Sequence, residues 1–306
     1  MSDHGAAAHR SGFACFVGRP NAGKSTLMNA LVGEKVAIMS SRPQTTRRAI
    51  RGIITRDDAQ LVIVDTPGLH RPRTLLGERL NDLVRETFAS VDVIGFCLPA
   101  DEKVGPGDQW IARELADAKA PVVAIVTKVD KVSRERVAEH LMAVSELGEF
   151  VDIVPVSSVK DVQMDVLFEV LVSRLPEGPQ LYPDGELTDE PEDIRIAEYI
   201  REAALEGVRD ELPHSIAVVV EEMLEREQAA DDPRVPILEI RAQLYVERDS
   251  QKGIIIGKGG SRLRDVGATA RADIERLLGR RVFLDLHVKV AKDWQRDPKQ
   301  MGRLGF

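Results

Sequence analysis

A glycine-rich stretch near the N-terminus carries the residue types that bind phosphate. It lies between an apolar run at residues 12–17 and a helical-looking run at residues 26–32, and reads Gly18, Arg19, Pro20, Asn21, Ala22, Gly23, Lys24, Ser25 and Thr26. Glycines let the backbone curl so that consecutive N–H groups point inward, and a following helix adds its positive N-terminus. Lys24 can then bind β- and γ-phosphates, and the Ser25 hydroxyl can coordinate Mg²⁺. The sequence therefore predicts a phosphate-binding loop and not an accidental glycine-rich turn.

A carboxylate motif follows the apolar run at residues 61–64. It consists of Asp65, Thr66, Pro67 and Gly68. A carboxylate at a strand end beside the phosphate loop can hold Mg²⁺ through water, and the Gly68 N–H can meet a γ-phosphate. Taken alone, the motif would be a Pro-Gly turn. Its place one strand beyond the phosphate loop favours a nucleotide site.

A third motif could recognise the base. It follows the apolar run at residues 122–126 and reads Thr127, Lys128, Val129 and Asp130. A carboxylate at Asp130 can accept two hydrogen bonds from guanine N1 and N2, which adenine does not offer, so this residue would select GTP over ATP. The aliphatic stem of Lys128 can cover the base. After the next apolar run, backbone N–H groups that could meet the guanine carbonyl belong to Val156, Ser157 and Ser158.

These motifs need a scaffold, and the hydropathy pattern predicts one. Short apolar runs typical of buried strands alternate with amphipathic segments typical of helices. The strands are expected at residues 13–17, 61–64, 91–98, 122–126 and 153–156, and the helices at 80–88, 110–118, 137–147 and 166–175. Such alternation predicts an α/β domain with a mainly parallel sheet and helices on both faces. Each motif then falls at the carboxyl end of a strand, where such sheets bind ligands.

Length and charge point to two domains with different partners. A chain of 306 residues is long enough for two cores. The net charge of −8 is uneven, because residues 177–233 carry 4 Lys and Arg against 18 Asp and Glu, whereas residues 234–306 carry 16 against 9. A basic C-terminal region beside an acidic one suggests a polyanionic partner.

Other classes of protein are disfavoured by what the chain contains. No apolar run approaches the roughly 20 residues that span a bilayer, and residues 1–11 lack the apolar centre of a secretory signal. We therefore expect a cytoplasmic protein. Cys15 and Cys97 lie in apolar runs, which predicts buried reduced thiols and no disulfide, metal or nucleophilic role.

Composition also sets the domain boundaries. We expect a disordered tail at residues 1–11, a nucleotide domain at 12–176, a linker rich in proline, glycine and acid at 177–192, and a second domain at 193–306. In the second domain the pattern predicts a helix at 194–208, strands at 215–220, 237–245 and 280–290, and a helix at 263–278.

A second glycine loop lies in this basic region. It follows an isoleucine run, precedes a helix, and comprises Ile256, Gly257, Lys258, Gly259, Gly260, Ser261 and Arg262. The arrangement resembles the GXXG loop of a KH domain. Glycines would let a nucleic-acid backbone approach closely, and Lys258 would neutralise phosphate. Alone, four such residues would be a glycine turn, but the surrounding basic charge favours RNA binding.

The four nucleotide motifs in this order resemble the GTPase domain of the Ras-like superfamily, and a GTPase joined to an α+β type II KH domain resembles the Era family. The resemblance covers nearly the full chain and includes residues 18–21, 44–47, 65–68, 176–179, 246–248 and 250–260. It implies a bacterial GTPase that binds the 3′ end of 16S rRNA and assists maturation of the small (30S) ribosomal subunit. It also implies a monomer with a peripheral fraction at the cytoplasmic membrane.

The resemblance also assigns roles within the site. It implies GTP or GDP with Mg²⁺, held by Ser25, Asp65 and a threonine of switch I, residues 36–48. That threonine would be Thr45 or Thr46; both are taken as nucleotide-binding and Thr46 as the metal ligand. The catalytic set would be Lys24, Thr46, Asn21 and Gly68. Asn21 is associated in this branch with a potassium ion, which we treat as a hypothesis.

Two departures from the pattern bear on activity. Thr127 stands where the family usually has asparagine, and it lacks the amide that braces the phosphate loop. Leu69 stands where Ras carries the glutamine that orients water, so turnover should be slow, roughly 10⁻⁴ to 10⁻² per second. The alternatives are an ATP-dependent P-loop kinase, an RNA chaperone with an inert nucleotide domain, and a membrane-associated cell-cycle GTPase.

Overall fold

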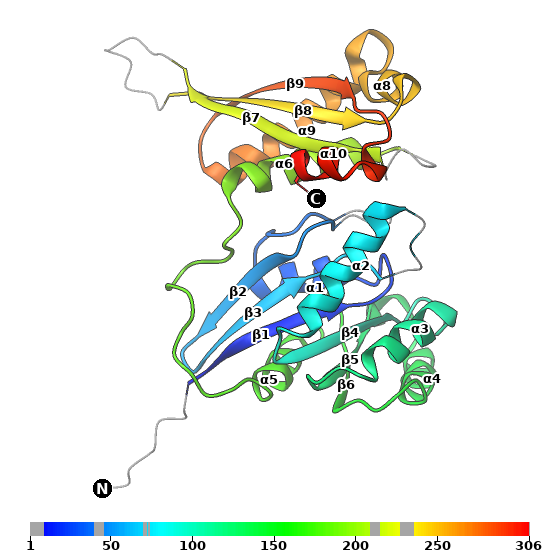
Figure 1. Ribbon diagram of the computed structural model, residues 1–306. Coiled ribbons are helices and arrows are strands. Elements are labelled where there is room, and N and C mark those ends of the chain that lie inside the picture. The colour runs from blue at the N-terminus through cyan, green and yellow to red at the C-terminus, as the bar shows by residue number, and fades with distance from the viewer. Residues whose placement is uncertain are drawn as a thin grey trace, which may run out of the picture. The chain divides into compact units, whose positions relative to one another are not determined.

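The computed structural model describes residues 9–39, 46–69, 72, 74–208, 215–226 and 236–305. The chain divides into two compact units, and the main boundary along the sequence lies between Asp189 and Glu190 (Figure 1). Within the described part, no helix is both long enough and apolar enough to cross a membrane.

The first unit is built on a six-stranded sheet. Its strands are β1 (Arg10–Val17), β2 (Ile50–Arg56), β3 (Ala59–Asp65), β4 (Val93–Pro99), β5 (Val122–Thr127) and β6 (Asp152–Pro155). Their order is β2-β3-β1-β4-β5-β6, and only the edge strand β2 pairs antiparallel. The predicted mainly parallel sheet is confirmed. Strand β2 was not predicted, because a glycine and three polar residues interrupt its apolar pattern.

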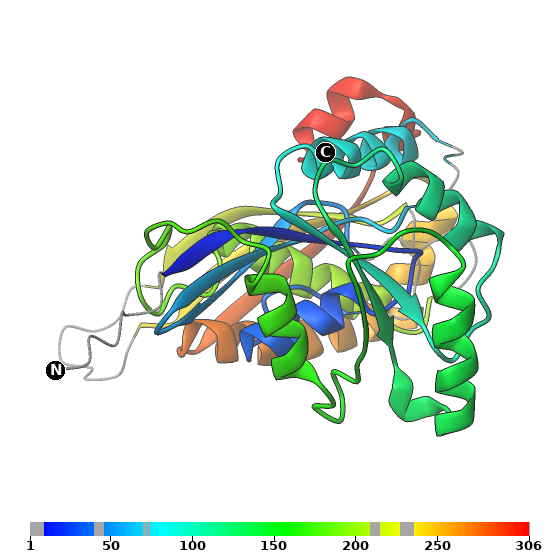
Figure 2. The same cartoon turned by 90° about the horizontal axis from the view of Figure 1, so that it is seen from below.

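Helices cover both faces of this sheet. They are α1 (Lys24–Val32), α2 (Leu75–Phe88), α3 (Pro106–Leu115), α4 (Arg134–Ser145) and α5 (Met164–Val172), with a 3₁₀ turn, η1 (Val129–Lys131). The apolar residues of α1 and α5 pack on one face, and those of α2, α3 and α4 pack on the other (Figure 2). The helices thereby leave the carboxyl ends of the central strands uncovered.

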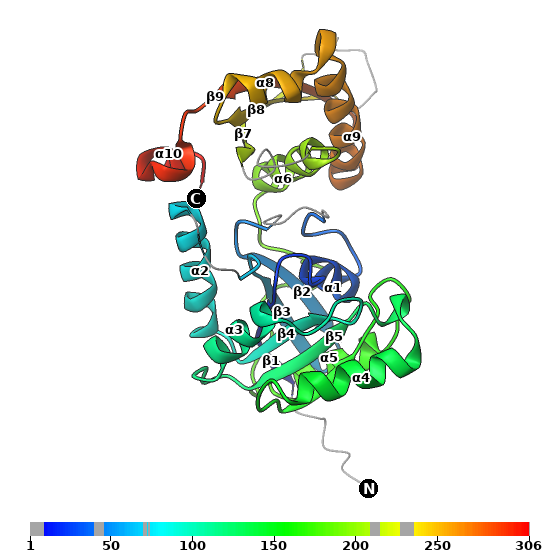
Figure 3. The ribbon, with the colours of Figure 1, turned by 90° about the vertical axis from the view of Figure 1, so that its right-hand side faces the viewer.

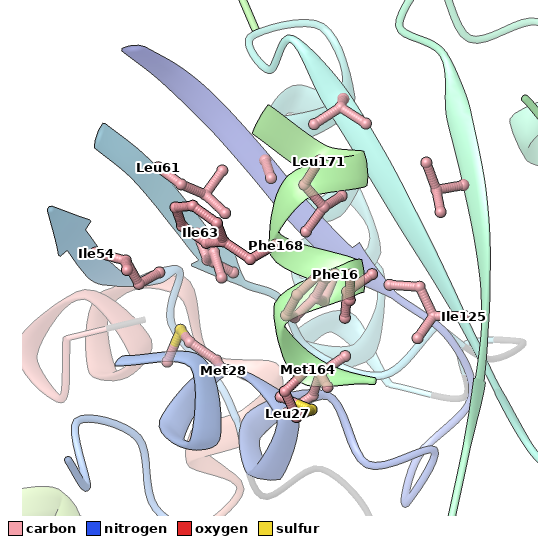
Figure 4. Packing of buried hydrophobic residues seen from close by; sticks show 14 of the residues in the cluster. Phe16, Leu27, Met28, Ile54, Leu61, Ile63, Ile125, Met164, Phe168 and Leu171 are labelled. Atoms are coloured by element: carbon pink, nitrogen blue, oxygen red, sulfur yellow. The ribbon is translucent and has the colours of Figure 1, made fainter. Parts of the chain in front are cut away.

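Close packing of large side chains holds the first of these layers together. Figure 4 shows Phe168 of α5 beside Leu61 and Ile63 of β3, and Met28 of α1 beside Ile54 of β2. Full burial of a side chain of this size contributes roughly 1.5–3 kcal/mol. Cys15 and Cys97 are buried and free, as expected, and burial raises the pKa of the Cys97 thiol to about 12.

The start of β1 corrects the predicted tail at residues 1–11, of which residues 1–8 lie outside the described residues. Arg10 and Ser11 already pair with β3. The Ser11 hydroxyl donates to the Pro179 carbonyl at 2.6 Å, and Arg10 Nη1 donates to the Leu175 carbonyl at 2.5 Å. These side chains hydrogen-bond to the neighbouring backbone instead of entering the core, so the hydropathy pattern does not reveal the strand.

Most of the expected linker packs against the first unit. The buried side chain of Gln60 accepts hydrogen bonds from the N–H groups of Leu181 and Tyr182, at 2.7 and 2.8 Å, and donates to the Tyr182 carbonyl. The Ile53 N–H donates to the Leu187 carbonyl at 2.9 Å. Leu187 therefore occupies part of the open edge of β2, and residues 181–182 pack beside Gln60 of β3.

The second unit has a three-stranded sheet with helices on one face. The strands are β7 (Ala217–Glu225), β8 (Leu238–Val246) and β9 (Val282–Val290), with β8 antiparallel to β7 and parallel to β9. The helices and turns are α6 (Glu192–Leu205), α8 (Asp249–Ile256), η2 (Lys258–Gly260), α9 (Ser261–Leu278), η3 (Trp294–Arg296) and α10 (Pro298–Arg303). Figure 3 shows α6 and α9 side by side against the sheet.

Candidate functional site

The predicted nucleotide motifs converge because the strands that carry them are parallel. The phosphate loop connects β1 to α1, Asp65 ends β3, Thr127 ends β5, and Val156 follows β6. All four positions therefore lie at the same edge of one sheet.

Close backbone approach explains two glycines of the site. A Cβ added to Gly18 would lie 2.6 Å from the Cys97 carbonyl oxygen, and one added to Gly68 would lie 2.8 Å from the Pro20 nitrogen. Gly23 has a φ of 92° and leads directly into α1 without a capping side chain. The first N–H groups of α1 thus remain available to an anion in the loop.

Lys24 lies inside the loop and is only 6% exposed. Its Nζ donates to the carbonyls of Gly18 at 3.3 Å and Arg19 at 3.1 Å. Burial lowers the pKa of this ammonium group, and the nearby Asp65 carboxylate opposes that effect. A buried cation surrounded by loop backbone is suited to bind a polyphosphate.

Three oxygen atoms form a cluster beside Lys24. Ser25 Oγ donates to Asp65 Oδ2 at 2.7 Å, Thr46 Oγ1 donates to the same oxygen at 3.0 Å, and the two hydroxyls are 3.1 Å apart. Burial raises the pKa of Asp65, with Lys24 acting against it. The other carboxylate oxygen, Oδ1, is buried and has no hydrogen-bond partner among the described residues.

This cluster fits Mg²⁺, which prefers hard oxygen ligands and few protein carboxylates. Among the described residues, no group of three or more His, Cys, Asp or Glu side chains could hold a metal. Of the two threonine candidates, Thr46 lies in the cluster, and Thr45 is outside the described residues.

The loop expected to recognise the base is held by two side-chain contacts. Ser157 Oγ donates to Asp130 Oδ1 at 2.6 Å, which orients a carboxylate that is itself exposed. Lys128 has a left-handed backbone with φ 59°, and its Nζ lies 3.4 Å from Asp101 Oδ1. Ser157 was expected to contribute only its backbone N–H, and Asp101 was not predicted. Thr66 Oγ1 donates to the Phe16 carbonyl at 2.7 Å. The other residues expected in these loops lie in the described part of the chain; they are Pro20, Thr26, Pro67, Val129 and Ser158.

Thr127 contacts the phosphate loop through its hydroxyl group. Its hydroxyl donates to the Ala22 carbonyl at 2.7 Å, across 105 positions of the chain. The amide is absent, as the sequence shows, but the hydroxyl that Thr127 retains still reaches the loop.

Replacing Thr127 by valine should weaken GDP binding about 5- to 100-fold, because the buried Ala22 carbonyl would lose its donor at a cost of about 1–3 kcal/mol. Titration with GDP measures this. Thr87→Val is the matched control, since that buried threonine donates to the Leu83 carbonyl within α2. The control should lower stability and leave GDP affinity unchanged; equal GDP affinity in both variants would contradict the brace.

Arg19 points out of the loop toward α3. Its Nε donates to Asp108 Oδ1 at 2.7 Å and its Nη1 to Glu102 Oε2 at 2.9 Å. Burial lowers the pKa of the guanidinium, but both carboxylates oppose it and the net shift is upward. Asp108 also accepts the Gly105 N–H at 2.9 Å. Asp108 therefore caps the start of α3 as well as holding Arg19.

Leu69 is 2% exposed and packs in the core, and its N–H donates to the Gly18 carbonyl at 3.2 Å. Its side chain offers no group that could orient water. Residues 40–45 of switch I lie outside the described residues, as do residues 70, 71 and 73 in the segment after Leu69.

The second glycine loop joins α8 to α9. Gly257, Gly259 and Gly260 have φ values of 72°, 60° and 77°, which favour glycine. A Cβ on Gly259 or Gly260 would meet nothing within 4 Å, and Lys258 is exposed. The structure brings residues 256–261 together in this loop, but it directs Arg262 elsewhere: Arg262 Nη2 donates to the carbonyls of Ala204 and Glu206 at the end of α6.

Comparison with known proteins gives the family. GTPase Era of Streptomyces coelicolor is 67% identical over 304 residues, which cover 97% of this chain and 95% of that protein. GTPase Era of Mycobacterium avium is 66% identical over 300 residues, covering 97% and 99%. The chain belongs to the Era family of GTPases. Family models agree: a 50S ribosome-binding GTPase model matches residues 13–128, and a KH domain model matches residues 211–295.

Solved Era structures share the fold. A crystal structure of Era in complex with MgGDPNP and nucleotides 1506–1542 of 16S ribosomal RNA has a TM-score of 0.91 and 35% identity, covering 97% of this chain and 99% of that one. A single-residue variant of Aquifex aeolicus Era bound to GDP.AlF4⁻ has a TM-score of 0.90 at the same identity and coverage. The predicted P-loop GTPase domain followed by a type II KH domain is confirmed.

Proposed function

We propose that this Era-family GTPase is a GTP-dependent switch that binds 16S rRNA near its 3′ end and assists maturation of the small (30S) ribosomal subunit. The observation that carries the nucleotide part is the meeting, at one sheet edge, of the buried Lys24, the three-oxygen cluster and Asp130. The RNA part is supported by the exposed Lys258 in its glycine loop and by the similarity to an Era structure that contains 16S rRNA.

Each part of the site has a defined task in this proposal. Lys24 and the first N–H groups of α1 bind the β- and γ-phosphates, and the Gly68 N–H binds the γ-phosphate. Ser25, Thr46 and Asp65 would hold Mg²⁺, which supplies positive charge to the phosphate oxygens. Asp130, oriented by Ser157, accepts the guanine N–H groups. We propose that Asn21 helps to bind a potassium ion.

Hydrolysis without a partner should be slow. Leu69 is buried and apolar, so this position does not orient the attacking water. We place the intrinsic rate at roughly 10⁻⁴ to 10⁻² per second. The cytoplasmic location, the monomeric state and the peripheral membrane fraction stay predictions.

RNA recovered by crosslinking the full chain, bound to a non-hydrolysable GTP analogue, should be enriched near the 3′ end of 16S rRNA. Lys258→Asp should remove this enrichment, because it places a negative charge where phosphate must approach. Lys119→Asp is the control, since Lys119 is an exposed lysine of the other unit. Diffuse RNA recovery that Lys258→Asp does not change would overturn the RNA part.

A GTP-dependent switch also requires that the bound nucleotide change the affinity for RNA. RNA should bind the GTP state more tightly than the GDP state, and by linkage RNA should favour GTP by the same factor. Equal RNA affinity in the two states would contradict the switch.

A further inference from the structure

Arg262 is an unusual member of the glycine loop, because its guanidinium group binds protein backbone. It is the second residue of α9 and follows the loop directly. Its Nη2 lies 3.2 Å from the Ala204 carbonyl oxygen and 2.6 Å from that of Glu206. The residues contacted and Arg262 are 56–58 positions apart, so the contact ties together two distant segments of the second unit.

The end of α6 requires such a partner. The last carbonyls of a helix have no intrahelical donor. Glu206, directly after α6, has an extended backbone with φ −61° and ψ 132°, and the left-handed Gly207 follows it with φ 68°. The Leu205 carbonyl accepts from the Val208 N–H at 3.4 Å, and Arg262 supplies a donor to the carbonyls of Ala204 and Glu206.

The same residue also supports the glycine loop. A Cβ added to Gly257 would lie 2.8 Å from Arg262 Cβ and 3.0 Å from Arg262 N, so the loop backbone passes directly over Arg262. The loop closes through the Gly260 N–H, which donates to the Gly257 carbonyl at 3.2 Å. Because glycines have wide conformational freedom, a loop with three of them needs an external anchor to keep one shape.

We propose that Arg262 is a positioning residue: it fixes the RNA-binding glycine loop by clamping the start of α9 to the carbonyl end of α6, and it is not a phosphate contact. The inference rests on the proposed RNA function. It separates two roles that the sequence makes look alike, since Lys258 and Arg262 are both cations in one short loop. Lys258 is the exposed charge that can meet phosphate, and Arg262 is the residue that holds the loop in position.

The two roles respond differently to lysine. A phosphate contact needs a positive charge, which lysine retains. A clamp on two carbonyls needs the planar, multiply donating guanidinium group, which the ammonium group of lysine does not reproduce.

The test uses the full chain and a synthetic RNA with the sequence of the 16S rRNA 3′ end, titrated at several salt concentrations. Arg262→Lys should weaken binding about 10-fold at every salt concentration, with an unchanged slope of log affinity against log salt. Lys258→Gln should reduce that slope by about 1, as expected for one lost phosphate contact. Arg264→Lys, an exposed arginine of the same helix, should leave affinity and slope unchanged.

Hydrogen exchange of the free protein is the second measurement, and it does not depend on RNA. Arg262→Lys should speed exchange of the amides at residues 257–261 about 10-fold or more, while the middle of α9 stays protected. Wild-type RNA affinity in Arg262→Lys, or unchanged exchange in the loop, would overturn the positioning role. Failure of the wild-type chain to bind the RNA would instead overturn the proposed function, and loop exchange would still decide the role of Arg262.

Discussion

Replacing Asp130 with alanine should lower the affinity for GTP by about 10³-fold or more and leave the weak affinity for ATP unchanged. A site that hydrogen-bonds a specific group of its ligand discriminates strongly, by up to about 10⁴–10⁵-fold, against ligands without that group. Asp130 is exposed at the site and already oriented by Ser157. The ratio of ATP to GTP dissociation constants, measured by titration calorimetry, should therefore fall toward 1.

Two variants sharpen this test. Ser157→Ala removes only the hydroxyl that orients the carboxylate, so it should cost about 10-fold in GTP affinity, in line with one hydrogen bond to a charged group. Asp152→Ala removes a carboxylate at the opposite end of β6, where it pairs with Arg174 on the surface, and should change neither affinity. If Asp130→Ala keeps the wild-type ratio, Asp130 does not read the base.

Replacing Asp108 with alanine should lower the free energy of unfolding of the first unit by about 3 kcal/mol. Removing one partner of a buried ion pair leaves the other charge without compensation and costs about 3–5 kcal/mol. We expect the lower end of that range, because the Asp108 side chain is 1% exposed but that of Arg19 is 26% exposed. Urea unfolding measures this change.

The same substitution should also weaken GDP binding. The Arg19 carbonyl accepts from Lys24 Nζ and from the Ala22 N–H, so an Arg19 side chain released from α3 loosens the backbone that holds Lys24. Glu102→Ala is the control: it removes the other carboxylate bound to Arg19, but Glu102 is 44% exposed, and exposed pairs contribute only about 0–1 kcal/mol. Equal losses in the two variants would show that burial of Asp108 is not what anchors the loop.

Local patterns could predict the scaffold and the order of the nucleotide motifs. The runs before Asp65 and Thr127 are continuous and apolar, as in strands buried on both faces, and glycine and proline mark the loops after them. Strand β2 could not be predicted in this way, because an edge strand carries exposed polar residues.

Contacts between segments that are far apart in the sequence could not be predicted from it either. Thr127 and Ala22 are 105 positions apart, Arg19 and Asp108 are 89 apart, and Arg262 and Ala204 are 58 apart. Each pair is formed by the tertiary fold, and no local spacing encodes it. Residue type alone therefore placed Arg19 and Arg262 among the ligand-binding cations, whereas their guanidinium groups bind other parts of the protein.

The contacts of Gln60 determine where the two units can be separated. A fragment ending at Pro176, where the alternating pattern stops, would deprive this fully buried amide of its partners at Leu181 and Tyr182 and would uncover the edge of β2. A free strand edge promotes association between molecules. We therefore expect an isolated GTPase unit to be less prone to associate when it retains residues 177–189, which end at the boundary between the two units.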